Sequence, residues 1–332
     1  MLNKKYIILL LFQVLFCYSI FDHTQDFKIP SSTYIASINT ENFYNFYNPA
    51  CNEINQNKYL YSSFGHYFDG ILKNQNIYFS INSNSFKTLN FSLIRSSIDN
   101  IYNTTNAWND DGDGIIDISE INYDNITTFS HNTLGIIISK SFILEEKYKM
   151  LPVFLDSKLR YGINSKFSFS SVASEKSFSH SFDLGFIYYP SKFLHSPWVP
   201  NIGLLIKDFL PYSYWSTGQI ENKKTLIMIG SSFSFIKNNE SNQNSFYINS
   251  DFNLFNLKHP SIGCEYQFKD NNNLISFQIN SSNIESSLGL IIRLSNQFDI
   301  GYSFVIPRNN ELTTSQKIMI GINSDILNNY IK

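Results

Sequence analysis

Apolar and polar residues alternate one by one along most of the chain, in short segments between about residue 59 and residue 322. In one segment Leu159, Tyr161 and Ile163 share one parity, whereas Arg160 and Gly162 take the other. Successive side chains of a β-strand point to opposite faces, so each segment has one apolar and one polar face. The alternation recurs in Ile262-x-Cys264-x-Tyr266-x-Phe268, Ile275-x-Phe277-x-Ile279, Phe298-x-Ile300-x-Tyr302-x-Phe304-x-Ile306 and Ile318-x-Ile320-x-Ile322.

This pattern predicts an all-β fold, a transmembrane antiparallel β-barrel of about 14 strands in a cell outer membrane. Most segments are about 9–13 residues long, which lets a tilted strand cross the bilayer. An even number of strands places both ends of the barrel on the periplasmic side. The expected strands lie near 58–66, 71–82, 87–96, 131–143, 157–170, 178–189, 200–209, 224–236, 244–255, 260–268, 273–281, 286–294, 298–306 and 315–324.

The chain divides into four predicted parts. Residues 1–19 resemble a signal peptide, because Lys4 and Lys5 precede a short apolar run that ends before Ser19. Cys17 would allow a lipoprotein instead, but Phe16 fits that motif poorly. Residues 20–57 are irregular and aromatic and are expected to form a plug or hatch in the lumen. Residues 58–324 form the barrel, and residues 325–332 form a tail.

Loop lengths predict which end of the barrel faces outward. If the first strand rises from the periplasm, the long connections 97–130 and 210–223 lie outside, and short ones at 82–86, 269–272 and 295–297 lie inside. Long outer loops and short periplasmic turns are typical of outer-membrane barrels. The connection 144–156 is long for a periplasmic turn.

The polar face predicts the lining of the lumen. This face is consistent with a water channel or with an interior packed around the plug, and we favour the packed interior. The inward candidates are Asp183, Glu265, Gln267, Gln278, Asn280, Arg293, Asp299 and Lys317.

Composition supports a barrel and removes some other classes. Charged residues make up 16% and the formal net charge is −2, so no nucleic-acid partner is expected. The 30 Phe and 21 Tyr suit interfacial aromatic girdles, and Trp198, Tyr212, Tyr214 and Trp215 are expected in such a belt. Cys51 and Cys264 remain after processing, either as a disulfide or, as we favour, as two separate thiols.

A calcium-type loop stands within the longest connection. Residues 109–120 match the spacing of a twelve-residue EF-hand loop, with Gly114 at the sharp turn. The alternative is a solvated acidic turn without metal. No helices are evident on either side, so a bound Ca²⁺ would staple the loop. The expected ligands are Asn109, Asp111, Asp113, the carbonyl of Ile115, Asp117 and Glu120.

Enzyme chemistry is not indicated. The six histidines are scattered, and no nucleophile elbow, phosphate-binding glycine loop or paired cysteine motif is present. His180 and Ser181 lie near one rim, but adjacent residues of a strand face opposite sides. The chain is therefore expected to be non-enzymatic.

Several motifs give the chain a family resemblance. Three stretches resemble the PorV/PorQ family of FadL-like outer-membrane proteins. They are Tyr47-Asn48-Pro49-Ala50 followed by Phe64-Gly65-His66-Tyr67, Ala107-Trp108-Asn109-Asp110 leading into Asp113-Gly114, and Ile206-Lys207-Asp208 followed by Trp215-Ser216-Thr217-Gly218. Cys51 stands where that family has Gly, and the chain ends Asn329-Tyr330-Ile331-Lys332 without a terminal aromatic residue.

The resemblance implies a 14-stranded barrel associated with type IX secretion. It implies outer-membrane lipid, secreted cargo with a C-terminal β-domain and secretion-machine subunits as partners, with loops 97–130 and 210–223 as contact candidates. The alternative function is a FadL-like transporter of hydrophobic small molecules, in which the aromatic segment 42–47 serves as hatch. A kinked strand with an inward apolar pocket would favour transport, and a tightly filled lumen with ordered outer loops would favour docking. A simple diffusion porin is disfavoured by the expected plug and the few luminal charges.

Overall fold

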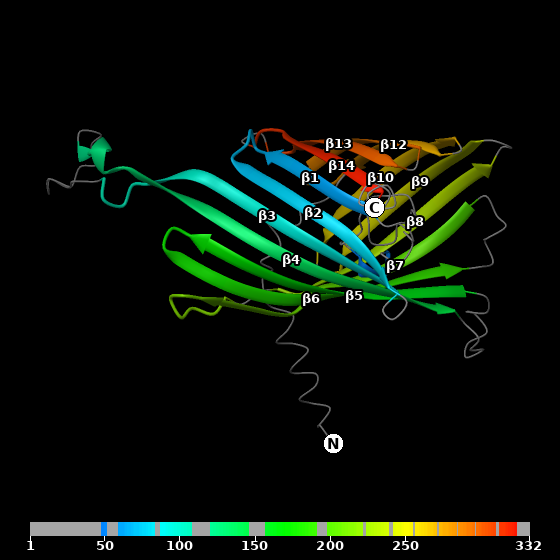
Figure 1. Cartoon of the computed structure of the whole chain (residues 1–332), viewed down its shortest axis with the longest axis horizontal. Coiled ribbons are helices and arrows are strands. Elements are labelled where there is room, and N and C mark those ends of the chain that lie inside the picture. The colour runs from blue at the N-terminus through cyan, green and yellow to red at the C-terminus, as the bar shows by residue number, and fades with distance from the viewer. Residues whose placement is uncertain are drawn as a thin grey trace, which may run out of the picture.

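A computed structural model shows that the chain forms a closed antiparallel β-barrel of 14 strands, as the alternation predicts (Figure 1). Each strand pairs with its neighbours in sequence, and β1 closes on β14 from Tyr59↔Asn323 to His66↔Gln316. The structure describes residues 48–51, 59–83, 87–107, 120–145, 157–190, 198–221, 224–238, 242–254, 256–270, 272–283, 285–295, 297–309 and 312–323. The predicted signal peptide 1–19 and tail 325–332 lie outside these residues.

The barrel consists of strands of very different length. Among the described residues, two short 3₁₀ turns accompany them, η3 (Pro49–Cys51) and η5 (Tyr123–Asn125). None of the described residues belongs to a helix long and apolar enough to span a membrane. The strands are β1 (Tyr59–Tyr67), β2 (Leu72–Ser83), β3 (Lys87–Asn103), β4 (Thr127–Glu145), β5 (Ser157–Val172), β6 (Glu175–Pro190), β7 (Trp198–Trp215), β8 (Leu226–Asn238), β9 (Asn242–Asn253), β10 (Asn256–Asp270), β11 (Asn273–Ser281), β12 (Glu285–Leu294), β13 (Phe298–Pro307) and β14 (Ser315–Asn323).

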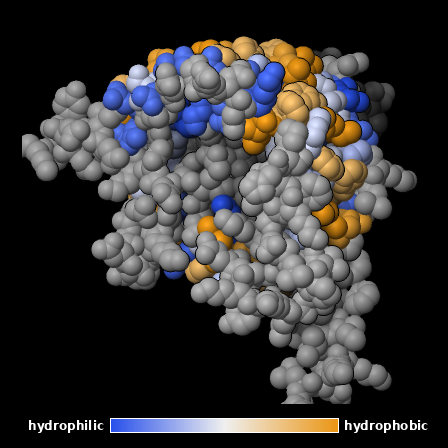
Figure 2. All heavy atoms as spheres, turned by 90° about the vertical axis from the view of Figure 1, so that its right-hand side faces the viewer, coloured by the Kyte–Doolittle hydropathy of each residue, from blue (hydrophilic) through white to orange (hydrophobic). Residues whose placement is uncertain are grey.

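The two faces of the barrel wall have opposite polarity. On β11, Phe277 and Ile279 point outward and are 55% and 57% exposed, whereas Ser276 and Gln278 point into the barrel and are buried. Figure 2 looks at the end where the even-numbered strands finish, and apolar residues gather on the outer surface. An apolar exterior around a polar interior is the arrangement of a transmembrane barrel, because only the outer face meets lipid. The protein therefore has the architecture of an outer-membrane β-barrel.

The structure extends four predicted strands by four or more residues at one end. β3 runs to Asn103 rather than 96, β4 begins at Thr127 rather than 131, β7 ends at Trp215 rather than 209, and β10 begins at Asn256 rather than 260. The β3–β4 ladder continues past the ends of β2 and β5 to Asn103↔Thr127, so this ribbon projects beyond the other strands (Figure 1). Past the barrel neither face needs to be apolar, so the alternation that marks a membrane strand stops before the strand does.

The connections follow from these bounds. The predicted loops 97–130 and 210–223 become 104–126 and 216–225, at the same end of the barrel. The predicted short turns lie at the opposite end, at 84–86, 271–272 and 295–297.

Candidate functional site

The inward-facing polar residues predicted from parity all lie on the luminal face. Asp183, Glu265, Gln267, Gln278, Asn280, Arg293, Asp299 and Lys317 are buried, with Arg293 the most exposed at 9%. Their burial arises inside the barrel, so they are covered by other luminal groups and not by a conventional apolar core. The predicted inward parity is therefore confirmed, and it supplies the wall on which the site is built.

A short turn near the chain's beginning is seated on this wall. Residues Asn48–Cys51 are fully or nearly buried. The turn is closed by two hydrogen bonds, from the Cys51 N–H to the Asn48 carbonyl at 3.0 Å and from the Ala50 N–H to Asn48 Oδ1 at 3.0 Å. Ala50 and Cys51 pack against Ile187 of β6. The turn belongs to the predicted plug segment 20–57, whose other residues lie outside the described ones.

Two facing glycines make room for the turn. Gly162 of β5 and Gly185 of β6 are cross-strand partners that face the lumen. A Cβ atom on Gly162 would lie 2.4 Å from the Pro49 carbonyl carbon, and one on Gly185 would lie 1.9 Å from Asn48 Oδ1. Real Cβ atoms do not approach other atoms so closely, so any larger residue at either position would displace the turn. We call Gly162 and Gly185 the glycine cradle.

Strand β7 is kinked above the cradle. Its register with β6 shifts twice, between His180 and Phe182 and between Phe182 and Leu184. Within the same stretch Asp208 and Leu210 have positive φ angles of 52° and 49°. Left-handed backbone is unfavourable for residues other than glycine and persists only where the surroundings enforce it. The double bulge also turns two successive side chains, Lys207 and Asp208, toward the lumen, where both are buried.

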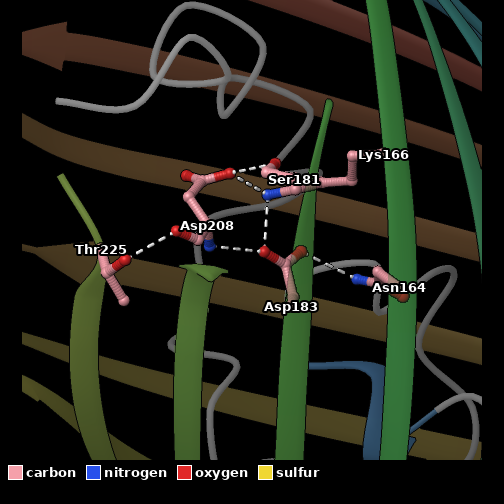
Figure 3. Close-up of polar contacts among 6 residues, drawn as sticks. All are labelled: Asn164, Lys166, Ser181, Asp183, Asp208 and Thr225. Carbon is pink, nitrogen blue, oxygen red and sulfur yellow. Dashed lines mark hydrogen bonds and ion pairs between the residues drawn. The ribbon is translucent and has the colours of Figure 1, made fainter. Parts of the chain in front are cut away.

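A buried ion cluster surrounds Asp208 (Figure 3). Lys166 Nζ of β5 lies 2.5 Å from Asp208 Oδ1 and 2.6 Å from Asp183 Oδ1 of β6. The Ser181 hydroxyl donates to Asp208 Oδ1 at 2.8 Å, and the Asn164 amide donates to Asp183 Oδ2 at 3.1 Å. Lys166, Asp183 and Asp208 are at most 3% exposed. We call these three residues the ion triad.

The backbone of Asp208 is bound by side chains. Its N–H donates to Asp183 Oδ1 at 2.9 Å, and its carbonyl accepts a hydrogen bond from the Thr225 hydroxyl at 2.8 Å (Figure 3). A buried peptide group without a partner costs free energy, so these contacts compensate for the bonds that a continuous ladder would make. The kink is therefore stabilised by specific side-chain hydrogen bonds to the backbone of Asp208.

The wall is interrupted beside the kink. The ladder between β7 and β8 ends at Lys207↔Leu226, while β7 continues to Trp215 in pairing with β6. The segment that follows β7 pairs with it again at Tyr214↔Ile220, where the Glu221 N–H donates to the Ser213 carbonyl at 3.2 Å. Among the described residues, the stretch 208–212 therefore has ladder pairing on its β6 side only. Its outward side chains include Leu210 and Tyr212, which are 46% and 43% exposed. We call the end of this ladder, together with residues 208–212, the wall interruption.

The glycine cradle and the ion triad are successive luminal layers of the same two strands. Gly162 faces Gly185, the next inward pair is Asn164 with Asp183, and the following one is Lys166 with Ser181. Two of the motifs that carried the family resemblance thus meet here, since Asn48-Pro49-Ala50 occupies the cradle and Ile206-Lys207-Asp208 forms the kink. The sequence alternation missed the triad, although two polar residues in a row at Lys207-Asp208 break the period of two.

A second luminal network lies at the seam of the barrel. Arg293 Nε donates to Asp299 Oδ1 at 2.9 Å, and the Tyr61 hydroxyl donates to Asp299 Oδ2 at 3.1 Å. The ring of Tyr61 covers Gly321, where a Cβ atom would lie 2.1 Å from a ring carbon. These contacts link β1 to β12, β13 and β14, across the joint where the first strand meets the last.

The predicted calcium ligands fall outside the described residues, apart from Glu120. The flanks of the loop are described, and the Asn122 N–H donates to the Ala107 carbonyl at 2.7 Å. This bond closes the base of the connection that contains residues 109–120. No group of three or more metal-ligating side chains occurs among the described residues. The calcium site stays a prediction.

Other predicted residues are placed individually by the structure. Ser181 is buried inside the barrel, whereas His180 lies on the outer face beside Tyr212, so they cannot act as a catalytic pair. Cys51 and Cys264 are not joined by a disulfide, and Cys51 lies in the lumen. Trp198 begins β7 and Trp215 ends it, with Tyr212 and Tyr214 exposed nearby. The predicted aromatic positions therefore lie near the two ends of one strand.

No family model matches the chain, and no curated protein matches its sequence. Its fold is similar to several solved outer-membrane barrels. The CymD monoaromatic hydrocarbon channel is 8% identical, with 89% of this chain and 93% of that chain covered at a TM-score of 0.47. The TodX monoaromatic hydrocarbon channel deltaS2 mutant is 7% identical, with 88% and 94% covered at 0.42. CdiB from Acinetobacter baumannii is 9% identical at 0.41, with 80% of this chain covered and only 59% of that longer chain.

Proposed function

We propose that the protein is a non-enzymatic outer-membrane channel that passes small hydrophobic molecules through the wall interruption beside β7. The observation that carries this proposal is the end of the β7–β8 ladder at Lys207↔Leu226 while β7 itself continues. Closed barrels normally satisfy every backbone group between strands. Here side chains take over that task at Asp208, and the segment that follows β7 pairs with it again only at Tyr214↔Ile220.

A lateral route suits an apolar solute. The lumen is lined mostly by amide, hydroxyl and charged side chains, with buried apolar residues such as Ile187, Leu205 and Ile291 among them, so a purely axial path would take an apolar molecule past many polar groups. Leu210 and Tyr212 cover the outer side of the kink, where the wall meets lipid. Moving between the lumen and the bilayer at this level lets the solute avoid further contact with water. The turn Asn48–Cys51, seated next to the kink, is placed to act as the hatch.

Uptake into proteoliposomes tests this function. The full-length mature protein is reconstituted, and entry of a naphthalene-sized fluorescent apolar probe is compared with entry of a hydrophilic disaccharide. We expect faster entry of the apolar probe than into protein-free vesicles and no faster entry of the sugar. Rapid entry of both solutes would indicate a diffusion porin, and rapid entry of neither would contradict the proposal.

A second candidate is docking of type IX secretion cargo, which the projecting β3–β4 ribbon favours. Beyond Ile98 and His131 the ribbon extends past its neighbours and carries Tyr102, which is 72% exposed, and Tyr123 in the adjoining turn η5 is 65% exposed. A projecting ribbon with free edges and exposed aromatic residues is suited to protein contact. Cargo proteins with a C-terminal β-domain and secretion-machine subunits are the proposed partners. Affinity purification from the native outer membrane, followed by mass spectrometry, would recover them together with the barrel if this candidate is correct.

A further inference from the structure

We infer that Lys166 is a positioning residue that holds the wall interruption in place, so that the ion triad acts as an electrostatic latch on strand β7. The assignment of a gating role to this latch rests on the proposed channel function. The structural role of Lys166 stands on the geometry of the wall alone. Three observations support it.

The first observation is that Asp208 combines an unfavourable backbone with an unusually complete set of partners. Its φ angle is 52°, and its carboxylate, N–H and carbonyl are all bound by side chains of other segments. Strained backbone persists where surrounding contacts over-determine it. Removing those contacts should let β7 return to regular pairing.

The second observation is that Lys166 bridges both carboxylates of the triad. Its ammonium lies within 2.6 Å of an oxygen of each aspartate, and all three side chains are buried. Without the cation, Asp183 and Asp208 would be two like charges in a site of low dielectric, which strongly disfavours their approach. The contact from the Asp208 N–H to Asp183 depends on that approach, so the bulge depends on Lys166.

The third observation is that the latch adjoins the seat of the hatch turn. Asn164 and Asp183 lie one luminal layer from Gly162 and Gly185, and Asn164 donates a hydrogen bond to Asp183. The turn and the triad thus contact the same short stretch of β5 and β6. We therefore expect a displacement of the turn to move the triad, and the reverse, because both contact the same hydrogen-bonded strands.

Cross-strand cysteines can measure the position of β7 directly. The two bulges place Ser213 opposite Ser179, with their hydroxyls 3.3 Å apart, whereas regular pairing would bring Pro211 to that position. Ser179→Cys and Ser213→Cys are introduced into a full-length protein carrying Cys51→Ser and Cys264→Ser. A control protein carries Phe186→Cys and Leu204→Cys, which are partners on the regular side of both shifts.

The test adds Lys166→Met to each cysteine pair. We expect oxidative cross-linking of the 179–213 pair to fall at least about tenfold, because a buried ion pair that loses one partner is strongly destabilised. Cross-linking of the 186–204 pair should stay unchanged, and Lys166→Arg, which keeps the cation, should restore most of the 179–213 product. Lys317→Met removes another buried luminal lysine, far from the triad on β14, and should leave both pairs unchanged.

Unchanged cross-linking of the 179–213 pair in Lys166→Met would overturn the latch. If that variant does not insert as a folded barrel, Thr225→Val is used in its place. It weakens the hold on the kink of β7 less, because it removes only the 2.8 Å hydrogen bond to the Asp208 carbonyl, and it should still lower cross-linking of the 179–213 pair. Probe uptake by the same proteins separates the two proposals. A shifted register with unaltered uptake supports the latch and contradicts the route beside β7.

Discussion

Two parts of one barrel wall have the same alternation of side chains and very different construction. From β10 to β14 the ladders run without a register shift between Ile262 and Asn323, and most strands are short. From β5 to β8 the wall carries two shifts, two strand residues with positive φ, a buried ion triad and a docked turn. Regular pairing is sufficient to cross a membrane. The irregular part needs side-chain contacts to hold it, so we expect function to reside there.

Displacing the turn from the glycine cradle is expected to give the largest effect. Gly185→Ala would place a methyl group 1.9 Å from Asn48 Oδ1, which the turn cannot accommodate. Labelling of the buried Cys51 by a maleimide, in a Cys264→Ser background, should accelerate at least about tenfold.

The matched control adds a methyl group to an inward glycine elsewhere. Gly65→Ala on β1 meets the Tyr67 ring and not the turn, so Cys51 should stay protected. Equal labelling in the two variants would mean that the cradle does not hold the turn.

Neutralising one carboxylate in each part of the wall sharpens the comparison. Asp183→Asn and Asp299→Asn each remove a buried carboxylate from its cationic partner, so each should lower the free energy of unfolding by about 3 kcal/mol. Only Asp183→Asn should also alter uptake of the apolar probe, because only Asp183 holds the kink. The measurements are urea unfolding in lipid and proteoliposome uptake. A similar change in uptake for both variants would contradict the division of the wall.

The predicted calcium loop lies outside both parts of the wall, in the connection between β3 and β4. Calcium should protect residues 97–130 from protease, since closely spaced carboxylates repel one another without a cation. Asp113→Asn should abolish that protection without affecting barrel insertion. Limited proteolysis with and without calcium, compared with Asp99→Asn outside the motif, measures the effect. Protection that persists in Asp113→Asn would remove the metal assignment.

A small effect is expected at the regular seam. Tyr61→Phe deletes the hydroxyl that donates to Asp299 but keeps the ring over Gly321. The free energy of unfolding should fall by about 1 kcal/mol, as for one buried hydrogen bond. Uptake should not change. A large loss of uptake would show that the seam takes part in transport.

The sequence predicts the regular part well because one physical cause produces its pattern. Lipid on one face and luminal groups on the other impose a period of two, so the parity of Gln278, Asp299 and Lys317 identified them as inward-facing. The same reasoning predicted that β7 ends at residue 209, whereas the strand continues to Trp215. At Lys207-Asp208 the bulge turns two neighbours inward, and a pattern of faces cannot distinguish a bulge from the end of a strand.

The candidate site depends on contacts between distant segments, which alternation does not encode. Lys166, Asp183 and Asp208 come from three strands, and only the register of β5, β6 and β7 brings them together. The glycine cradle could not be predicted from the sequence either, because the need for glycine at Gly162 and Gly185 follows only from the close approach of Pro49 and Asn48. The family resemblance included Asn48-Pro49-Ala50 and Ile206-Lys207-Asp208. It did not indicate that these two segments contact neighbouring positions on the same strands.

A reversible cross-link across the wall interruption tests the central claim most directly. Phe209→Cys and Lys224→Cys stand where the β7–β8 ladder would continue beyond Lys207↔Leu226, and Leu205→Cys with Met228→Cys forms a control pair inside the intact ladder. In a background without Cys51 and Cys264, oxidation of the first pair should abolish the accelerated uptake of the apolar probe, and reduction should restore it. Oxidation of the control pair should have no effect. Undiminished uptake through a barrel fully cross-linked at 209–224 would contradict a lateral route beside β7.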